Sequence, residues 1–230
     1  MSLSFPFNIS KGEILEIDLN YINRATKGVY ELGSVFKTFT FTAGLNEGEI
    51  NLDTPFTNLE KKIYCAGRPI GEYDDKIPKD LTAEQILIRS GNIGSVRIGQ
   101  KLGIEKLKSF LENIGVLGSI EFDIEEVAPS KKFVWGKCKL ATAAFGHGIS
   151  TSALQVAKGY AIISNGGFEI KPTLIKKNFD IEPKEKILSE NVSKNMNLIL
   201  RKIVSTEIGT AGFANIPGYE VGGKTGTAEK

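Results

Sequence analysis

The stretch GSVFKTFT, residues 33–40, places a glycine, a serine and a lysine at the start of a strongly apolar segment that runs to Gly48. The spacing of its phenylalanines predicts a helix that is buried nearly all round. Ser34 and Lys37 are three residues apart, so their side chains share one helix face across one turn. The stretch therefore predicts an amine beside a hydroxyl at a helix N-terminus, where free N–H groups favour developing negative charge.

A serine hydroxyl is a weak nucleophile unless an adjacent base takes its proton. Lys37 can serve as that base only when it is neutral, and burial beside Phe36 and Phe41, or a second cation nearby, would lower its pKa. A plainer interpretation is that Ser34 is only the N-cap of the helix. Two further motifs, which follow in order, favour the catalytic interpretation.

The second motif is Ser-Gly-Asn at residues 90–92, in the predicted turn between two helices. The first of these is expected at about 83–89 after a capping-box pattern, and the chain continues as helices near 92–102 and 104–114, closed by glycines. The serine hydroxyl could relay a proton and the asparagine amide could hold a substrate group, although both residue types also cap helices well. A competing match at residues 189–191 is assigned to the cap of the last predicted helix.

The third motif is Lys-Thr-Gly-Thr at residues 224–227, in a glycine-rich segment, 219–228, that is predicted to be a strand. A strand glycine often marks a close approach of a ligand to the backbone. Lys224 supplies positive charge and Thr225 a hydroxyl, which together suit a substrate carboxylate. The alternative is a solvated lysine on an edge strand.

Length and composition limit the classes of protein. The 230 residues suit one large domain or two small ones, and an apolar fraction of 41% is ordinary for a globular chain. A net charge of +2, with basic residues spread along the chain, gives no argument for nucleic-acid binding. No stretch reaches the length of a membrane span, and no signal peptide is visible. Cys65 and Cys138 lack the spacing of a zinc or redox site and are expected to be ordinary buried or partly buried thiols, with a disulfide left undecided.

The rest of the chain is expected to alternate loops with short regular elements. Two stretches are predicted to be mainly loops, residues 49–80 and 116–138. A helix capped by Ser150 or Thr151 is expected to end near residue 165. Residues 168–177 are predicted to form a strand or hairpin.

Together and in this order, the three motifs are the set shared by penicillin-binding proteins and class A β-lactamases. The run YELGSVFK, residues 30–37, resembles the nucleophile turn of class B penicillin-binding proteins, which usually has proline where this chain has Leu32. Three further runs look like the same family, at residues 90–94, 145–150 and 216–219. Asn92, in place of aspartate, favours the septal, division-specific branch. The resemblance covers about residues 20–230.

The resemblance implies a peptidoglycan D,D-transpeptidase that cross-links the cell wall at division through an acyl-serine intermediate. Ser34 would be acylated by the D-Ala-D-Ala end of a stem peptide, with loss of D-Ala. Lys37 would accept the serine proton, and Ser90 would relay a proton toward the leaving amine. β-Lactams would mimic the donor and acylate Ser34 stably.

The same resemblance implies binding roles for the remaining motif residues. Asn92 would orient the donor peptide amide, while Lys224 and Thr225 would hold the terminal carboxylate. The backbone N–H groups of Ser34 and Thr227 would form the oxyanion hole. No cofactor and no metal is implied.

The fold implied is α+β, of the penicillin-binding transpeptidase and serine β-lactamase type, with an all-helical part and an α/β part on a five-stranded antiparallel sheet. Because the chain stops soon after the third motif, we expect most of the sheet to be missing and the fragment, residues 1–230, to be predominantly helical. Residues 49–165 would form mainly the all-helical part, and residues 20–48 and 166–230 would be remnants of the α/β part. Without neighbouring strands, the third motif is expected to be displaced, poorly ordered or paired with another chain, which would leave the fragment weakly active or inactive.

The partners implied are peptidoglycan stem peptides, β-lactam antibiotics and, for a full-length protein, membrane proteins of the divisome. Such a protein would sit at the periplasmic face of the bacterial inner membrane, anchored by an N-terminal helix that is not in this chain.

Three other functions remain open: a serine β-lactamase, a β-lactam sensor without turnover, and a binding scaffold with a dead site. A lactamase of class A would need a glutamate between the second and third motifs; Glu121, Glu125 and Glu126 lie there, but their surroundings do not resemble the loop that carries it. His147, the single histidine, is not expected to be catalytic, because no acidic partner is identifiable and Lys37 fills the role of base.

Overall fold

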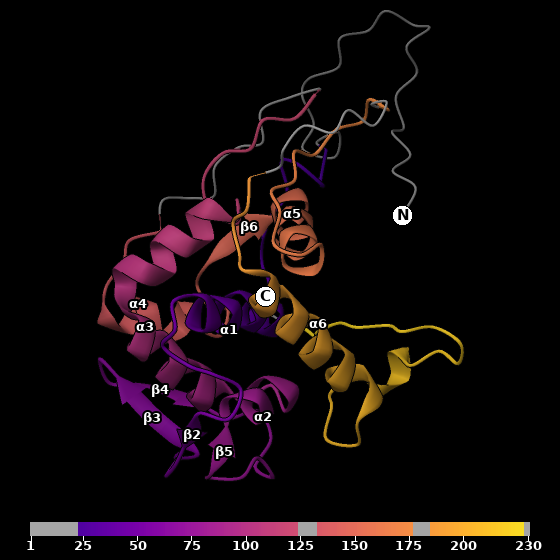
Figure 1. The fold of residues 1–230 in the computed structure, drawn as a ribbon. Helices are drawn as coiled ribbons and strands as arrows, with labels where there is room; N and C mark the ends of the chain where they lie inside the picture. The colour runs from indigo at the N-terminus through magenta and orange to yellow at the C-terminus, as the bar shows by residue number, and fades with distance from the viewer. Residues whose placement is uncertain (1–22, 124–132, 177–184, 228–230) are drawn as a thin grey trace, which may run out of the picture.

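The structure, a computed structural model, describes residues 23–123, 133–176 and 185–227. The described part is mainly helical, with helices α1 (Lys37–Asn46), α2 (Ala83–Ile88), α3 (Asn92–Asn113), α4 (Lys137–Ala143), α5 (Ala153–Ser164) and α6 (Glu190–Ser205), and short 3-10 helices η3 (Gly33–Phe36) and η4 (Gly212–Ala214). Helix α1 lies near the middle and packs chiefly on α3, with α6 on another side (Figure 1). None of the helices in these three ranges is both long enough and apolar enough to cross a membrane.

Strands occur as three antiparallel pairs in the described residues. They pair β1 (Val29–Glu31) with β6 (Ser150–Ser152), β2 (Pro55–Phe56) with β5 (Leu81–Thr82), and β3 (Lys62–Cys65) with β4 (Arg68–Gly71). No five-stranded sheet is present in the part of the chain that the structure describes. The predicted α+β fold, with helices predominating, is confirmed.

Helix α1 forms the centre of the core, as its sequence predicts. Every residue from Lys37 to Gly44 is buried, including the polar Lys37, Thr38, Thr40 and Thr42. Phe36 packs edge-on against Phe39 at 5.6 Å between ring centroids. At Gly44 an added Cβ would lie 2.9 Å from the Ile50 side chain, so glycine lets α1 approach its neighbours closely. The burial of α1 fixes the direction of the Lys37 side chain.

The predicted boundaries of α2 and α3 are confirmed. Thr82 accepts a hydrogen bond from the backbone of Gln85 and Gln85 bonds back to Thr82, which is the expected capping box. Gly103 has a φ of 75° inside α3, at the junction predicted between two helices. The turn that carries the second motif therefore lies between two well-defined helices.

Residues 49–80 are mainly loop, as predicted, but they contain short strands. Of these, β3 and β4 form a hairpin whose turn residues, Ala66 and Gly67, have positive φ values of 49° and 76°. Such two-residue turns match the twist of paired strands. The prediction that Ser150 or Thr151 caps α5 is wrong: the cap is Ser152, which directly precedes the helix and accepts from the Gln155 N–H.

The two cysteines form a disulfide, so the expectation of free thiols is wrong. Cys65, at the end of β3, is joined to Cys138 in α4 with their Cα atoms 5.5 Å apart. Their separation of 73 residues gives no signal in the sequence. The bond ties the β3–β4 hairpin to the helical part.

A strand or hairpin is expected at residues 168–177, but the described part of this stretch shows a single bridge, in which Phe168 pairs with Lys186. Lys177 lies outside the described residues, as do Glu125 and Glu126.

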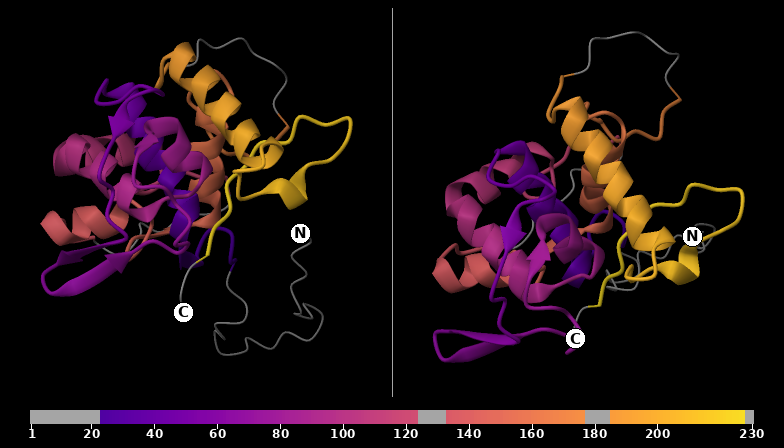
Figure 2. Two further views of the ribbon diagram at one scale, coloured as in Figure 1. Left: turned by 90° about the horizontal axis from the view of Figure 1, so that it is seen from below. Right: turned by 60° about the horizontal axis from the view of Figure 1, so that its bottom comes forward.

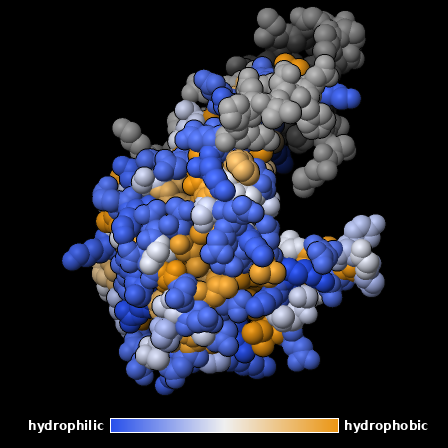
Figure 3. Space-filling view, in the orientation of Figure 1, coloured by the Kyte–Doolittle hydropathy of each residue, from blue (hydrophilic) through white to orange (hydrophobic). Residues whose placement is uncertain are grey.

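The C-terminal segment leaves α6 through η4 and returns along the same helix (Figure 2). It forms no strand in residues 219–227, so that prediction is wrong for the described part. Instead, the Gly223 N–H donates to the Leu200 carbonyl at 3.0 Å, and Arg201 Nη1 donates to the Val221 carbonyl at 2.9 Å. Helix α6 thus supplies hydrogen-bond partners for this segment. In the orientation of Figure 1, apolar side chains form a band across the middle of a largely hydrophilic surface (Figure 3).

Candidate active site

Ser34 lies within η3, directly ahead of α1, and its side chain is partly buried. The cap positions of η3 and α1 are held by Leu32 and Phe36, and neither helix has a side-chain cap. The interpretation of Ser34 as a simple N-cap is therefore wrong. Its hydroxyl is not used to close the helix.

The turn that carries Ser34 is held by two parts of the chain far from it in sequence. A Cβ added at Gly146 would lie 1.9 Å from the Gly33 carbonyl oxygen, so the turn that contains Gly146 packs directly on residue 33. From α5, the Tyr160 hydroxyl bonds to Thr38 Oγ1 at 2.8 Å and donates to the Val35 carbonyl at 3.3 Å. Burial raises the pKa of Tyr160 to about 12, so this hydroxyl keeps its proton. No sequence pattern indicates Tyr160.

Lys37 is 1% exposed and its amine is surrounded by the second motif. Lys37 Nζ donates to the Ser90 carbonyl at 2.5 Å and to Asn92 Oδ1 at 2.6 Å, and it lies 3.2 Å from Ser90 Oγ. Burial is the main cause that holds the pKa of Lys37 well below its usual range, Lys224 lowers it further, and the Glu72 carboxylate opposes both. Among the described residues, the hydrogen bonds of the amine go to Ser90 and Asn92 and none joins it to Ser34.

Ser90 adopts a backbone conformation that side chains usually avoid. Its φ is 59°, and it follows the C-cap of α2. The Gly91 N–H donates to the Ile86 carbonyl and the Ser90 N–H to the Leu87 carbonyl, which is the hydrogen-bond pattern of a Schellman motif. Serine here takes the place usually given to glycine, and both its carbonyl and its hydroxyl reach Lys37 as a result.

Asn92 is the first residue of α3, and its side chain is held at both ends. Its Oδ1 accepts from Lys37, and its Nδ2 donates to the Gly71 carbonyl at 2.8 Å. Its backbone N–H donates to Glu72 Oε2 at 2.6 Å. Sequence reasoning missed Glu72, since no motif surrounds it.

Lys224 approaches the same serine from the other side. Lys224 Nζ donates to Ser90 Oγ at 2.7 Å and lies 3.0 Å from the Thr225 carbonyl and 3.3 Å from Thr225 Oγ1. Burial lowers the pKa of Lys224 to about 8. Thr225 Oγ1 also bonds to Thr210 Oγ1 at 2.8 Å. The second and third motifs therefore meet at the Ser90 hydroxyl.

The third motif is not displaced, contrary to expectation. A Cβ added at Gly226 would lie 2.5 Å from the Val35 side chain and 2.9 Å from the Leu32 carbonyl, so this segment lies against the turn that carries Ser34. Thr227, the next residue, is exposed. Bonds to α6 and Ser90 seat the segment without the strand neighbours that we considered necessary.

His147 has an acidic neighbour, which corrects a second expectation. Its Nδ1 lies 3.8 Å from Glu31 Oε2, and the same oxygen accepts the Gly148 N–H at 3.0 Å. The imidazole also stacks on Phe145. Glu31, at the end of β1, therefore links the turn at residues 146–148 to the strand that precedes Ser34.

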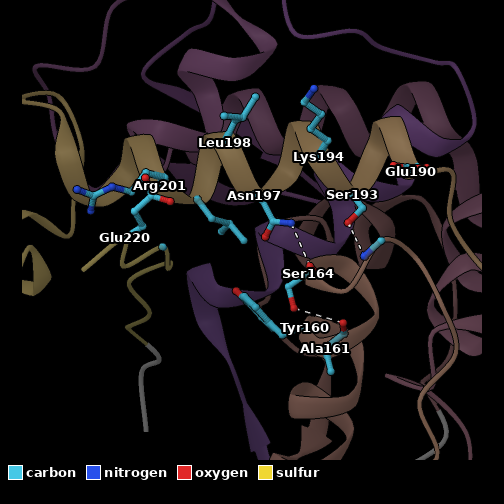
Figure 4. Close-up of a pocket in the computed structure, with 13 residues that line it drawn as sticks. Tyr160, Ala161, Ser164, Glu190, Ser193, Lys194, Asn197, Leu198, Arg201 and Glu220 are labelled. Atoms are coloured by element: carbon cyan, nitrogen blue, oxygen red, sulfur yellow. Dashed lines mark hydrogen bonds between the residues drawn. The ribbon is translucent and has the colours of Figure 1, made fainter. Parts of the chain in front are cut away.

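The competing Ser-x-Asn match serves as a cap, as predicted. Ser189 Oγ accepts from the Val192 N–H at 3.2 Å at the start of α6. A cavity of about 800 Å³ opens nearby, between α5 and α6, where Asn197 reaches Ser164 (Figure 4). Neither it nor the second cavity, near Glu121, is lined by a residue of the three motifs. In the described residues no cluster of side chains could hold a metal ion.

Known proteins match nearly the whole chain. A family model described as penicillin binding protein transpeptidase domain matches residues 6–230. A probable peptidoglycan D,D-transpeptidase FtsI of Caulobacter vibrioides is 35% identical over 91% of this chain and 36% of its own length. A probable peptidoglycan D,D-transpeptidase PenA of Neisseria flavescens is 27% identical over 90% of this chain and 51% of its own. The chain spans about a third to a half of these curated relatives.

Solved structures agree with the sequence comparisons. The transpeptidase domain of penicillin-binding protein 3 from Burkholderia pseudomallei superposes with a TM-score of 0.82 at 28% identity, covering 90% of this chain and 63% of that one. A structure described as a peptidoglycan glycosyltransferase from Burkholderia ambifaria gives 0.84 at 27% identity, covering 91% and 67%. The chain therefore belongs to the penicillin-binding protein transpeptidase family.

Proposed function

We propose that this chain carries the acyl-serine chemistry of a peptidoglycan D,D-transpeptidase of the division-specific type, acting on D-Ala-D-Ala stem peptides. The observation that carries the proposal is the buried Lys37 amine, which is linked through Ser90 to Lys224. Two amines joined by one hydroxyl can move a proton without a histidine. The names of the relatives, probable peptidoglycan D,D-transpeptidases, support the substrate class.

Lys37 would act as the base that activates Ser34. A neutral amine has two N–H groups and one lone pair. The two N–H groups match the two acceptors that it contacts, the Ser90 carbonyl and Asn92 Oδ1. The lone pair is then left for a hydroxyl hydrogen, and the lowered pKa makes the neutral form accessible.

The reaction would run as two proton-balanced steps. Ser34 Oγ attacks the carbonyl carbon of the penultimate D-Ala while its proton passes to Lys37. The C–N bond then breaks, and the leaving amine takes a proton through Ser90 from Lys37, so D-Ala departs and an ester remains. An amine of a second stem peptide attacks the ester, gives up one proton, and forms the new amide as Ser34 regains its hydrogen.

The third motif would bind the substrate and polarise it. Lys224 is mainly charged below a pH of about 8 and would hold the terminal carboxylate together with Thr225. The backbone N–H groups of Ser34 and Thr227 would form an oxyanion hole, worth roughly 3–4 kcal/mol per donor. Asn92 would orient the donor peptide.

The disulfide supports an extracytoplasmic location, because disulfides persist in oxidising compartments such as the periplasm. We propose the periplasmic face of the inner membrane, with an N-terminal anchor and divisome membrane proteins as partners of the full-length protein. Residues 49–165 would be mainly the all-helical part of the domain, with 20–48 and 166–230 belonging to its α/β part.

The experiment is intact-mass measurement after incubation with benzylpenicillin, with the Ser34→Ala variant as control. One stable adduct on the wild type and none on the variant is expected. Sustained nitrocefin hydrolysis would favour a β-lactamase instead; Glu121 lines a cavity away from the three motifs, which speaks against it. No adduct on the wild type would contradict the proposal and leave a binding scaffold with a dead site. A stable adduct without formation of cross-linked peptide would favour the sensor.

A further inference from the structure

The N-terminus of α3 is capped by a side chain from a distant part of the chain. Gly91 holds the N-cap position and supplies no side-chain bond. Glu72, which follows β4, accepts the Asn92 N–H at Oε2, 2.6 Å away, and the Ile93 N–H at Oε1, 2.9 Å away. A carboxylate on two free N–H groups at the start of a helix is favoured both by hydrogen bonding and by the helix dipole.

The same strand end also orients the Asn92 side chain. The Gly71 carbonyl accepts the Asn92 Nδ2–H at 2.8 Å, which turns Oδ1 toward Lys37 Nζ, 2.6 Å away. Residues 71 and 72 therefore hold both the backbone and the side chain of Asn92. A single slip of this strand end would move the oxygen that faces the lysine.

The strand end is itself fixed by contacts outside the site. Strand β4 pairs with β3 in an antiparallel register that sets Gly71 opposite Lys62. The disulfide ties the last residue of β3 to α4. The Glu72 N–H donates to the Lys61 carbonyl at 3.1 Å. These contacts therefore fix the backbone that carries the Glu72 carboxylate.

The Glu72 charge also faces the buried amine. Two charged groups act on Lys37: Lys224, from the C-terminal segment, and Glu72. Helix α1 carries no other charged residue, and the first turn of α3 has no acidic residue. From α5 the nearby titratable group is Tyr160, which stays neutral, and from the turn after α2 it is Arg89, whose charge acts on Tyr73.

We propose that Glu72 is a positioning residue of the site, which holds Asn92 Oδ1 on Lys37 and sets one negative charge near the Lys37 amine. The proposal rests on the proposed function for its effect on acylation. Burial and Lys224 both favour the neutral amine, but a lysine that loses its proton too easily is a weak base. Glu72 opposes them and keeps Lys37 basic enough to take the serine proton.

Two variants separate the position of this carboxylate from its charge. Glu72→Gln removes the charge and can accept only one of the two N–H groups, so the rate constant for acylation by benzylpenicillin is expected to fall about tenfold. The acid limb of the pH–rate profile for acylation is expected to move to lower pH, because the charge that raises the pKa of Lys37 is gone. Glu72→Asp keeps the charge on a shorter side chain, so the rate should fall while the acid limb stays closer to that of the wild type.

The matched control is Ser189→Ala, which removes a helix cap of similar kind at the start of α6. It should leave both the rate and the acid limb unchanged. Glu72→Gln with a wild-type rate and a wild-type limb would overturn the proposal. An equal loss of rate in Ser189→Ala would also overturn it, since the effect would then be general destabilisation.

A second measurement does not depend on acylation. The NMR titration of the Lys37 Cε resonance reports the charge on the amine directly, and its midpoint should be lower in Glu72→Gln than in the wild type. If the wild type forms no penicillin adduct but the midpoint still moves, the proposed function fails and the placement of Glu72 stands. An unmoved midpoint refutes the role of Glu72 whatever the enzyme does.

Discussion

Ser90 occupies a backbone position that most helix ends give to glycine, so the Ser90→Gly variant separates the strain of this position from the chemistry of its side chain. The serine has a φ of 59°, and a side chain there costs about 1 kcal/mol relative to glycine. Glycine relieves that strain but loses the hydroxyl that Lys224 and Lys37 contact at 2.7 and 3.2 Å. The carbonyl bond to Lys37 depends on the backbone and is kept.

These terms nearly cancel in stability and do not cancel in rate. The lost hydrogen bonds of the hydroxyl are worth about 1–2 kcal/mol, so the free energy of unfolding of Ser90→Gly should lie within about 1 kcal/mol of the wild type. Ser90→Ala loses the same bonds and keeps the strain, so it should be about 1 kcal/mol less stable than Ser90→Gly. Both variants lack the hydroxyl that we propose as the proton relay, so acylation by penicillin should fall about 100-fold or more in each.

Urea unfolding and stopped-flow acylation decide the matter. An alanine variant as stable as the glycine variant would refute the argument that residue 90 is strained. A glycine variant that acylates at the wild-type rate would refute the relay, whatever its stability.

Three further predictions follow from the packing and charges of the site. Gly146→Ala should lose about 2 kcal/mol of unfolding free energy and be acylated slowly, because its Cβ would meet the Gly33 carbonyl. The control Gly48→Ala has a similar φ of 68° but open space around the Cβ, so it should lose less stability and no activity. Urea unfolding and acylation rates compare the two variants. Lys37 and Lys224 both have a lowered pKa in the folded chain, so the unfolded chain binds more protons between pH 8 and the usual lysine range of about 10.5, and stability should rise with pH there. In Lys224→Met the pH series of urea midpoints should show a smaller rise, and an equal rise would contradict the assignment. Replacing both cysteines with serine should cost about 2–4 kcal/mol of unfolding free energy, because the disulfide links residues 73 positions apart in the sequence, and urea unfolding tests this.

Features that depend on neighbouring residues in the sequence could be predicted, and the structure explains why. The capping box at Thr82, the break at Gly103 and the burial of α1 each follow from spacing within one or two turns. The partners of Asn92 could not be predicted in this way. Glu72 is 20 residues from Asn92 and reaches it only because the turn at Ala66 and Gly67 folds β3 back on β4.

The disulfide and the Glu31–His147 contact were missed for the same reason. Cys65 and Cys138 are 73 residues apart, and Glu31 is 117 residues from Gly148, the neighbour of His147 to which it bonds. Each contact joins segments that are far apart in the sequence. A single sequence shows residue types that favour such contacts but does not show which pairs meet.

The prediction that the third motif is displaced is wrong, because it assumed that strands alone could supply hydrogen-bond partners for this segment. An extended segment needs partners for its backbone, and we considered strands the only source. In the folded chain the Gly223 N–H bonds to a carbonyl of α6, and the Lys224 amine ends on Ser90. Bonds to Leu200 and Arg201 of α6 and to the Ser90 hydroxyl therefore hold the segment in place.

The residues of the site are therefore held in place in two separate ways. Lys37, Ser90 and Asn92 stand on the packing of α1 against α3 and on the braced end of β4. Lys224 joins them from outside, through a segment held to α6 by a few bonds. Weakening that segment should remove the second cation from Ser90 and leave the Lys37–Asn92 bond in place. The lysine would then regain part of its proton affinity, since one of the two causes that lower its pKa is lost while burial remains.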